Sequence, residues 1–361
     1  MKAVAVLPFA AEEVDPDASD LALWLTADVA AELSAANVIE ARLVVEAVEI
    51  APAEAARQLG TELALGATLD LASGNVELAA LLVAPDGAIK AQWNESVPLG
   101  AAAQLPRMLA RATLLALGED SSAPPQSVEP QVSPEAVLRL ARAARRIDRG
   151  DVDEGTDELL AIVESEPSFD APRRTLLQTA RAAIGGDRMP SFFSALERLA
   201  DARPDDAEAL LALGDYRSLH FDEAGARELY LRARDAAEDP VVAGHACAGL
   251  AALAEAAQRT DEAVLHLRAA IKLRDDAHLY ARLAALLLEK DATEGLQMLT
   301  RATVLAPDDA QLLLALARAH RRHGGDLSKA LIAATRAARL SAGDADLAEQ
   351  VREELQLLIH G

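Results

Sequence analysis

The chain has 361 residues, a formal net charge of −23 at pH 7, and very few aromatic residues among many small apolar ones. This length predicts two or three domains. The excess of negative charge repels a nucleic-acid backbone or an anionic membrane, so the sequence argues against both as general partners. The single cysteine, Cys247, excludes a disulfide framework and a clustered-thiol metal site and fits a reducing compartment.

The first residues read as a β-strand rather than as a secretory signal. The apolar stretch at residues 2–9 is short and is followed by acidic residues and proline, without a cleavage region. Apolar runs elsewhere stay far below the ~18 residues of a membrane span. We therefore expect a soluble, cytoplasmic protein without membrane insertion.

Residues 1–118 alternate between strand and helix patterns. Helices are predicted at residues 18–36, from Pro52 to the stop at Gly60, and at residues 101–117. Strands are predicted at residues 2–9, 38–45, 62–70, 76–84 and 88–97, the last three joined by the turn sequences SGN and PDG. The order β-α-β-α-β-β-β-α predicts an α/β domain with one mixed sheet.

Three strings in this domain carry a family resemblance. They are AVAVLPF at residues 3–9, ARQLGTELALGATLD at residues 56–70 and VELAALLVAPDGAIKAQWNESV at residues 76–97. Together they resemble the amino-terminal α/β domain of TolB and the TolB-like domains that precede repeat arrays in bacterial regulators. The resemblance implies a non-enzymatic module of envelope or signalling assemblies, although the periplasmic location of TolB does not follow.

A proline- and serine-rich segment divides the chain. Residues 119–134 lack apolar periodicity and have the composition of an extended linker. We expect the α/β domain at residues 1–118, the linker at 119–134 and a helical array at 135–361. Residues 1–120 hold 18 acidic and 6 basic residues, a net charge of −12, so the acidity is densest in the α/β part.

The array repeats small residues at fixed offsets. Four units carry three such residues, 11 to 13 and then 7 positions apart: Gly214, Ala226 and Ala233; Ala251, Ala263 and Ala270; Ala284, Gly295 and Ala302; Ala317, Ala330 and Ala337. Two weaker copies precede them: Ala143, Gly155 and Ile162; Ala180, Phe192 and Leu199. Because larger residues stand at three of these positions, we expect the helices of the first two units to lie further apart or to be rotated.

A unit of about 34 residues with this pattern resembles the tetratricopeptide repeat (TPR), in which a pair of helices stacks on the next pair. The resemblance implies an all-α, right-handed superhelical solenoid of about six units, with a closing helix at residues 344–360. Small residues are needed where the two helices of a unit cross closely, and Leu210, Leu213, Tyr230 and Leu267 are expected to fill the space around the crossings.

Several polar clusters resemble chemical sites, but each has a simpler interpretation. The pairs Asp205-Asp206, Asp275-Asp276 and Asp308-Asp309 precede helices and are expected to cap them. In the turns GDVDEG and GGDLSKA a glycine is expected to end one helix and an aspartate to cap the next.

The remaining clusters point away from metals and catalysis. DVDEGTDE lacks the glycine and the bidentate glutamate of a calcium loop. His320 and His323 read as a solvated helix end rather than a metal site, and Cys247 as a small buried hydrophobe. Since nucleotide-binding and hydrolase motifs are also absent from the sequence, we expect neither an enzyme nor a cofactor.

In the TPR family the partner-binding groove is lined mainly by the first helix of each unit. The family's groove offsets fall on Glu208 and on the following candidates for partner binding: Arg174, Leu177, Arg181, Leu211, Asp215, His245, Glu255, His278, Leu314, Arg318, Arg321 and Arg322. This face is basic at both ends and acidic between them. An ordinary solvated face is the competing interpretation, and the spacing of the basic units argues against binding of chaperone tails.

The sequence thus favours a non-enzymatic scaffold or adaptor in a bacterial multiprotein assembly, which binds a protein or peptide with acidic segments in the groove. Burial of the three groove leucines would supply affinity, and the arginines would select acidic segments. The alternative is a regulatory or sensory module, in which the α/β domain binds a ligand or a second protein and signals through the array.

Overall fold

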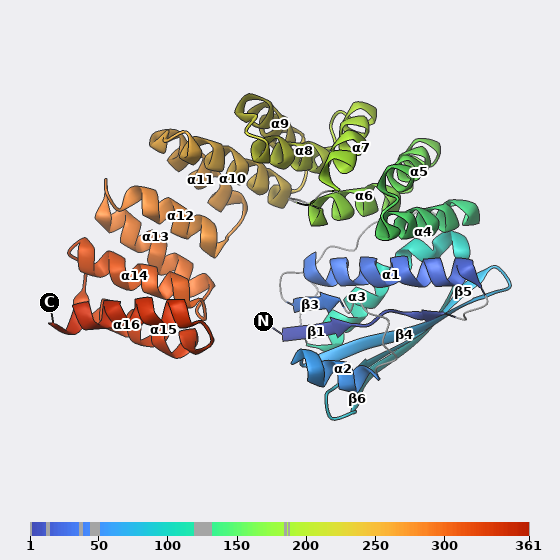
Figure 1. The fold of residues 1–361 in the computed structure, drawn as a ribbon, viewed down its shortest axis with the longest axis horizontal. Helices are drawn as coiled ribbons and strands as arrows, with labels where there is room; N and C mark the ends of the chain where they lie inside the picture. Colours follow the sequence, from blue (N-terminus) through green and yellow to red (C-terminus); the bar gives the residue numbers. More distant parts are fainter. Residues whose placement is uncertain are drawn as a thin grey trace. The chain divides into compact units, whose positions relative to one another are not determined.

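The structure is a computed structural model of the chain. It describes residues 2–11, 15–35, 39–43, 51–118, 132–183, 186 and 188–360, so most of the predicted linker lies outside the described residues. The chain forms two compact units, Met1–Ala202 and Arg203–Gly361. Figure 1 labels the helices and strands of both units, and each unit is described by itself below.

The first unit begins with a mixed sheet, as the sequence predicts. Its strands are β1 (Lys2–Val6), β2 (Ala10–Ala11), β3 (Ile39–Leu43), β4 (Leu63–Ala72), β5 (Asn75–Val83) and β6 (Ile89–Pro98). They are ordered β3-β1-β4-β5-β6, and the short β2, which the sequence did not predict, pairs with β4. β1 runs parallel to β3 and β4, whereas β4, β5 and β6 are antiparallel.

Three helices pack on this sheet. They are α1 (Pro16–Ala35), α2 (Pro52–Leu59) and α3 (Leu105–Ala116), the last preceded by a 3₁₀ turn at Leu99–Gln104. α1 and α3 lie together on one face, and α2 lies on the other (Figure 1). Gly60 ends α2 with φ of 61°, in the left-handed region that favours glycine. In the β4–β5 turn Ser73 and Gly74 both have positive φ, which suits a tight hairpin.

The rest of the chain forms successive pairs of helices. The first helix of each pair is called helix A and the second helix B. The pairs are α4 (Pro134–Arg149) and α5 (Val152–Ser165); α6 (Ala171–Ala182) and α7 (Met189–Ala202); α8 (Ala207–Leu219) and α9 (Glu223–Ala236); α10 (Pro240–Ala256) and α11 (Thr260–Leu273); α12 (Ala277–Leu287) and α13 (Ala292–Leu305); α14 (Ala310–Arg322) and α15 (Leu327–Leu340); α16 (Ala345–His360) follows the last pair.

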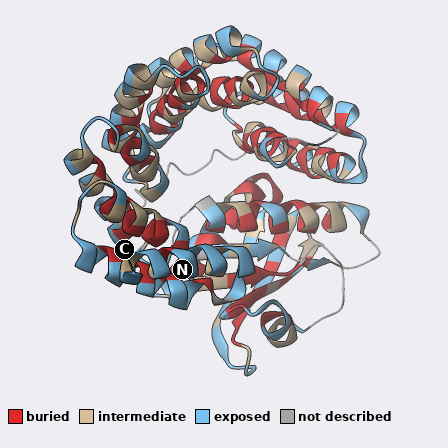
Figure 2. Ribbon diagram, turned by 60° about the vertical axis from the view of Figure 1, so that its left-hand side comes forward, coloured by how far each residue is buried: buried red, intermediate tan, exposed pale blue. Residues whose placement is uncertain are grey.

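The repeated small residues lie where the helices of a pair cross. Gly214, Gly295 and the alanines at the repeat positions of the last four units are buried, and Figure 2 shows buried residues on the sides of the helices that face their neighbours. A Cβ on Gly214 would lie 2.7 Å from the Tyr230 ring, and a Cβ on Gly295 would lie 2.8 Å from Leu288 Cγ. The predicted packing role of these positions is confirmed, as is the burial of Leu210, Leu213, Tyr230 and Leu267.

The second pair departs from this pattern, in line with its larger residues. Phe192 and Leu199 are buried at the positions where other units have alanine. α7 contacts α5 of the preceding pair more extensively than its own partner α6. Bulky crossing residues thus turn helix B of this pair towards the preceding one.

The predicted helix caps are confirmed with one exception. The carboxylates of Asp206, Asp276 and Asp309 accept backbone N–H groups at the starts of α8, α12 and α14. Asp326 caps α15 in the same way. The cap expected from Asp151 is wrong, because its side chain makes no capping hydrogen bond at the start of α5.

The prediction for His320 is also wrong. The side chain is 6% exposed rather than solvated, and its Nδ1 accepts the Asp326 N–H at 3.1 Å. Acceptance requires a neutral Nδ1, and burial lowers the pKa of this imidazole. His320 therefore supports the turn between α14 and α15. The expectation for Cys247 is confirmed: the thiol is buried and its pKa is raised by burial.

The α/β part and the first four repeat helices belong to one compact unit. α1 packs along α4, although residues 119–131 between these parts are not described. The division at residues 119–134 stays a prediction. Within the described residues, the α/β part and the first repeats share an interface.

Candidate functional site

Helix α1 lies against the helix-A side of the first two repeat pairs, which the TPR resemblance assigns to the groove. It contacts α4, and its side chains reach α6. On α4 the side chains of Val137, Leu140 and Ala141 are buried. The predicted binding face thus already holds a helix of the same chain in this unit.

Acidic residues of α1 meet arginines of the repeats. Arg142 of α4 pairs with Asp17 at 3.1 Å, and Arg145 of α4 lies 3.4 Å from Asp20. On α6 the predicted groove residue Arg174 is buried and pairs with Glu32. Glu32 also accepts from Arg107 Nε of α3 at 3.1 Å. Arginines at the predicted basic end of the groove are therefore paired with acidic side chains of the same chain.

Trp24 is the apolar anchor of the same interface. It is 2% exposed, and its indole Nε1–H donates to Thr175 Oγ1 of α6 at 3.2 Å. A buried tryptophan whose N–H is satisfied combines a large apolar contact area with a fixed orientation. The interface is therefore well packed rather than a loose contact of charges.

A cavity of about 410 Å³ lies beside Trp24. It is lined by α1, by the end of α4, by α6 and by the start of α7. The lining residues include Trp24, Asp28, Ile147, Asp148, Gln178, Thr179, Arg188 and Phe192. Mostly apolar walls with a few polar groups are typical of small-molecule sites.

Asp28 is the unusual group in this wall. It is 2% exposed, and both carboxylate oxygens are buried without a well-formed hydrogen bond, although the Gln178 side chain lies beside them. The nearest cation is Arg174, with Nη2 3.6 Å from Oδ2. Burial raises the pKa of Asp28, and neighbouring Glu32 also raises it, while the Arg174 guanidinium and the Gln178 amide lower it without reversing the shift.

The other predicted basic end lies on α14 in the second unit, and α16 packs on both helices of the last pair, more extensively on α15 than on α14. Arg321 donates to both carboxylate oxygens of Glu354, at 2.6 and 2.9 Å, and Arg318 donates to Gln350 at 3.2 Å. Arg322 is exposed. A shallow hollow of about 380 Å³, which includes Leu314 and Arg318, lies between α14 and α16. α16 thus continues the stack as the first helix of a next pair would, and its side chains engage Arg318 and Arg321.

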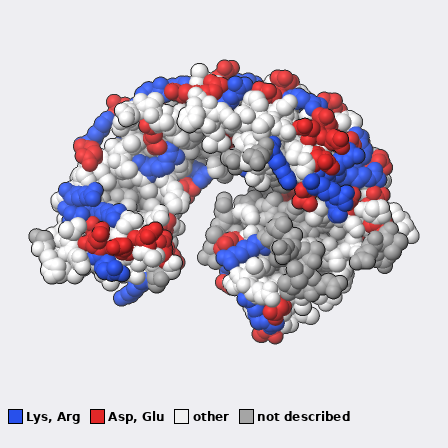
Figure 3. Space-filling model, viewed as in Figure 1, with Lys and Arg blue, Asp and Glu red and all other residues white. Residues whose placement is uncertain are grey.

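Between these ends, the predicted residues mostly have partners within the array. Asp215 accepts the Tyr230 hydroxyl at 2.8 Å, and Glu255 pairs with Arg282 at 2.9 Å. His245 lies 2.6 Å from Arg274 Nη1, whereas His278 is exposed. Figure 3 shows the wider pattern, in which basic and acidic atoms lie side by side over the repeat helices.

Small residues line the rest of this face on α10 and α12. Ala252 and Ala285 are exposed, and Ala248 and Ala281 are partly buried. Residues without long side chains let the backbone of an approaching helix come close. This stretch of α10 and α12 is called the alanine face below.

The three groove leucines do not form an accessible binding surface, contrary to the prediction from the sequence. Leu177, Leu211 and Leu314 are 1%, 6% and 2% exposed and belong to the core of the array. The expectation that they gain affinity by becoming buried on binding is wrong, because little of their surface remains accessible. Arg181 lies exposed near the end of α6.

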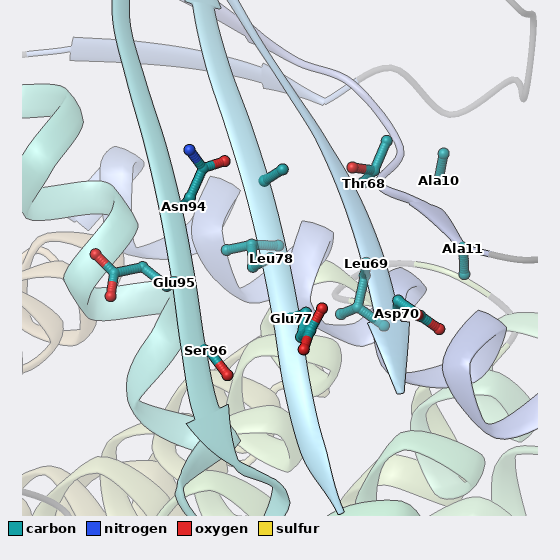
Figure 4. Close-up of a pocket in the computed structure, with 11 residues that line it drawn as sticks. Ala10, Ala11, Thr68, Leu69, Asp70, Glu77, Leu78, Asn94, Glu95 and Ser96 are labelled. Carbon is teal, nitrogen blue, oxygen red and sulfur yellow. The ribbon is translucent and has the colours of Figure 1, made fainter. Parts of the chain in front are cut away.

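A second hollow, of about 680 Å³, lies on the sheet in the first unit (Figure 4). Its walls include Thr68, Asp70, Glu77, Asn94 and Ser96 from β4, β5 and β6. Asp70 and Glu77 are direct partners across the β4–β5 ladder. These are exposed or half-exposed polar groups on an open sheet face.

Sequence reasoning missed Trp24, Asp28 and Glu32, although a signal was present. Asp20, Trp24, Asp28 and Glu32 follow one another at intervals of four, so they share a face of α1 beside the apolar stripe that starts at Leu21. A buried tryptophan among acids marks a face that meets a basic partner. Glu354 had no comparable signal, because its helix carries many acids.

The parts of the chain that the structure describes hold no group of three or more histidine, cysteine or acidic side chains placed to bind a metal ion. Across the same residues, no helix combines the length and apolarity needed to cross a bilayer.

Comparison with known proteins gives structural neighbours only. No family model and no curated protein matches the chain. Solved structures that resemble it include YrrB, described as a TPR protein with an unusual peptide-binding site (16% identity over 54% of this chain and 97% of that one, TM-score 0.41), and Pseudomonas aeruginosa PilF (14% identity, 61% and 97% coverage, TM-score 0.47). MamA is also similar (15% identity, 47% and 92% coverage, TM-score 0.39). Since these TM-scores lie below 0.5, the assignment of TPR-like pairs rests on the repeat positions of the chain itself.

Proposed function

We propose that the protein is a non-enzymatic, cytoplasmic scaffold of a bacterial multiprotein assembly, which binds a helical segment of a partner on the helix-A face of its array. The α/β part is proposed to be a TolB-like domain, joined to the array through residues 119–134. The right-handed TPR superhelix suggested by the repeats would present the helix-A faces along one groove.

One observation carries this proposal: in the first unit the helix-A face holds a helix of the same chain. α1 contacts α4, and its side chains reach α6. Asp17 and Glu32 of α1 pair with arginines of these two helices. A surface that accepts a helix of its own chain in this way is suited to accept one from a partner further along the array.

The alanine face of α10 and α12 is the part of this surface that we assign to the partner. Its exposed alanines allow close approach, and the nearby pair of Glu255 and Arg282 offers charges of both signs. The proposed ligand is an amphipathic helix with small or apolar residues towards Ala252 and Ala285. An acidic residue on that helix would reach Arg282.

A double variant tests the assignment. Ala252→Arg with Ala285→Arg places two long cations on the alanine face while leaving the helix crossings intact. Proteins that co-purify with the wild-type chain from its native host should be lost. The matched control is Ala338→Arg, which adds the same side chain at an exposed position of α15, a helix B.

One result of comparing the double variant with the control would contradict the assignment. If the double variant, folded by circular dichroism, retains the same co-purifying proteins as the Ala338→Arg control, the partner does not use the alanine face. Replacement of Arg318 and Arg321 is a poorer test, because both side chains hold α16.

A further inference from the structure

The cavity beside Trp24 is distinct from the alanine face and has an apolar interior. It lies between α1 of the α/β part and the repeat helices α4, α6 and α7, within one compact unit. Leu23, Trp24, Ile147 and Phe192 supply most of the apolar wall, together with several alanines. Its volume of about 410 Å³ falls in the range of small-molecule pockets.

The hydrogen-bond donors inside the cavity wall already have partners in the protein. The Trp24 Nε1–H donates to Thr175 Oγ1 at 3.2 Å. The Thr26 hydroxyl donates to the carbonyl oxygen of Ala22 at 2.7 Å, and the Thr179 hydroxyl donates to that of Thr175 at 2.8 Å. Because these donors are used within the protein, they do not call for a polar ligand.

The carboxylate of Asp28 does not call for a polar ligand either. Both of its oxygens are buried, and they lie beside the Arg174 guanidinium and the Gln178 side chain. A molecule in the cavity cannot donate to oxygens that have no accessible surface. Asp28 thus contributes to the wall without offering its charge to a ligand.

The two charged groups at the rim of the cavity have opposite signs. Asp148 and Arg188 both belong to the lining, and both are exposed. Arg188 also donates to the carbonyl oxygen of Ile147 at 3.2 Å. One charge of each sign in solvent selects neither a cation nor an anion, and a charged group that entered the apolar interior would lose its hydration without gaining a partner.

We propose that this cavity binds an uncharged, apolar small molecule, which contacts Trp24, Ile147 and Phe192. Apolar cavities in proteins take up benzene-like molecules, because the burial of apolar surface is favourable without any hydrogen bond. The inference goes beyond the proposed scaffold function, because it requires no protein partner. The bound molecule contacts both α1 and the repeat helices and so stabilises the attachment of the α/β part to the array.

Trp24 provides a direct readout, since the chain contains only one other tryptophan, Trp93. In a full-length Trp93→Phe background, titration with propylbenzene should give a saturable change in Trp24 fluorescence. Protonated 2-phenylethylamine and the anion 3-phenylpropanoate have the same ring and a similar length but carry a charge. Each should bind at least about tenfold more weakly than propylbenzene. Absence of a saturable change with propylbenzene, or equal affinity for either charged analogue, would overturn the proposal.

A variant that fills the cavity locates the binding site. Ala144→Leu in the same background adds volume to the lining from a half-buried position of α4 and should weaken propylbenzene binding at least about tenfold. The matched control is Ala202→Leu, the same change at an exposed position of α7 outside the lining, which should leave the affinity unchanged.

A second filling variant covers the case in which the α4 variant does not fold. Ala182→Leu adds the same volume from an exposed position of the lining on α6 and should also weaken propylbenzene binding. Circular dichroism confirms that each variant is folded. Unchanged affinity in the folded filling variants would place propylbenzene elsewhere and contradict the assignment.

Discussion

Two equally buried carboxylates, Asp28 of α1 and Glu354 of α16, differ in how they are satisfied. Each is 2% exposed, and each belongs to a helix outside the repeat pairs. Glu354 accepts two hydrogen bonds from Arg321, whereas Asp28 accepts none and faces Arg174 at 3.6 Å. The fully paired carboxylate stabilises the packing of α16, whereas burial of Asp28 without such a partner costs stability.

The largest loss of stability is expected from removal of Trp24, the apolar anchor of the α1 interface. Trp24→Ala removes a buried indole and its bond to Thr175, and should lower the free energy of unfolding by about 4 kcal/mol. Chemical denaturation measures the loss. Trp93→Ala, at a half-buried position of β6, is the control and should cost less. Equal losses would mean that α1 is not anchored on the repeats by Trp24.

Removal of Glu354 should be the next largest change. Glu354→Ala leaves Arg321 without its bidentate partner and should lower the free energy of unfolding by about 3 kcal/mol. Glu353→Ala changes an exposed neighbour on the same helix and should stay within about 0.5 kcal/mol of wild type. If the two variants behave alike, α16 is not held by this pair.

Asp28→Asn should not lower the stability at pH 7, in contrast to Glu354→Ala. Because the folded-state pKa of Asp28 is raised, its ionised form costs stability at neutral pH, and that cost disappears as the pH falls through the raised pKa. The variant should therefore be at least as stable as wild type at pH 7. Denaturation at a series of pH values should show that the difference in unfolding free energy between the variant and the wild type disappears in acid. A destabilised variant at pH 7 would show that Asp28 is adequately paired.

The smallest expected effect is a pH dependence of stability that comes from His320 in the second unit. The pKa of His320 is lowered from its ordinary 6.5, so its contribution to stability is full above that pH and is lost as the pH falls through the lowered value. His320→Gln should remove this acid-sensitive contribution, as seen in melting temperatures between pH 7 and pH 5. His278→Gln, at an exposed position, is the control and should melt close to wild type.

Local features of this fold could be predicted from the sequence, and distant contacts could not. The caps at Asp206, Asp276 and Asp309 depend on a few neighbouring residues, and the small crossing residues recur at fixed offsets. The contact of α1 with α4 and α6 joins segments more than a hundred residues apart across a proline-rich stretch. No local pattern specifies which helix covers Arg174.

For the candidate site, too, the sequence predicted local features but not distant contacts. The groove offsets located the helix-A side of the array, but not which of its residues are already used. Leu177, Leu211 and Leu314 serve the core, and Arg174, Arg318 and Arg321 hold helices of the chain itself. Side-chain burial depends on neighbouring helices in three dimensions. The structure therefore shifts the proposed partner site to the alanines of α10 and α12.

Site-specific photo-crosslinking tests the central claim, that the helix-A face binds a partner helix, most directly. A benzophenone amino acid is placed at position 252 or 285 on the alanine face, or at position 338 on α15 as the control. Irradiation in the native host should link positions 252 and 285 to the same partner peptide, identified by mass spectrometry, and should link position 338 to none. Crosslinks from position 338 to that peptide, without crosslinks from 252 and 285, would contradict the claim.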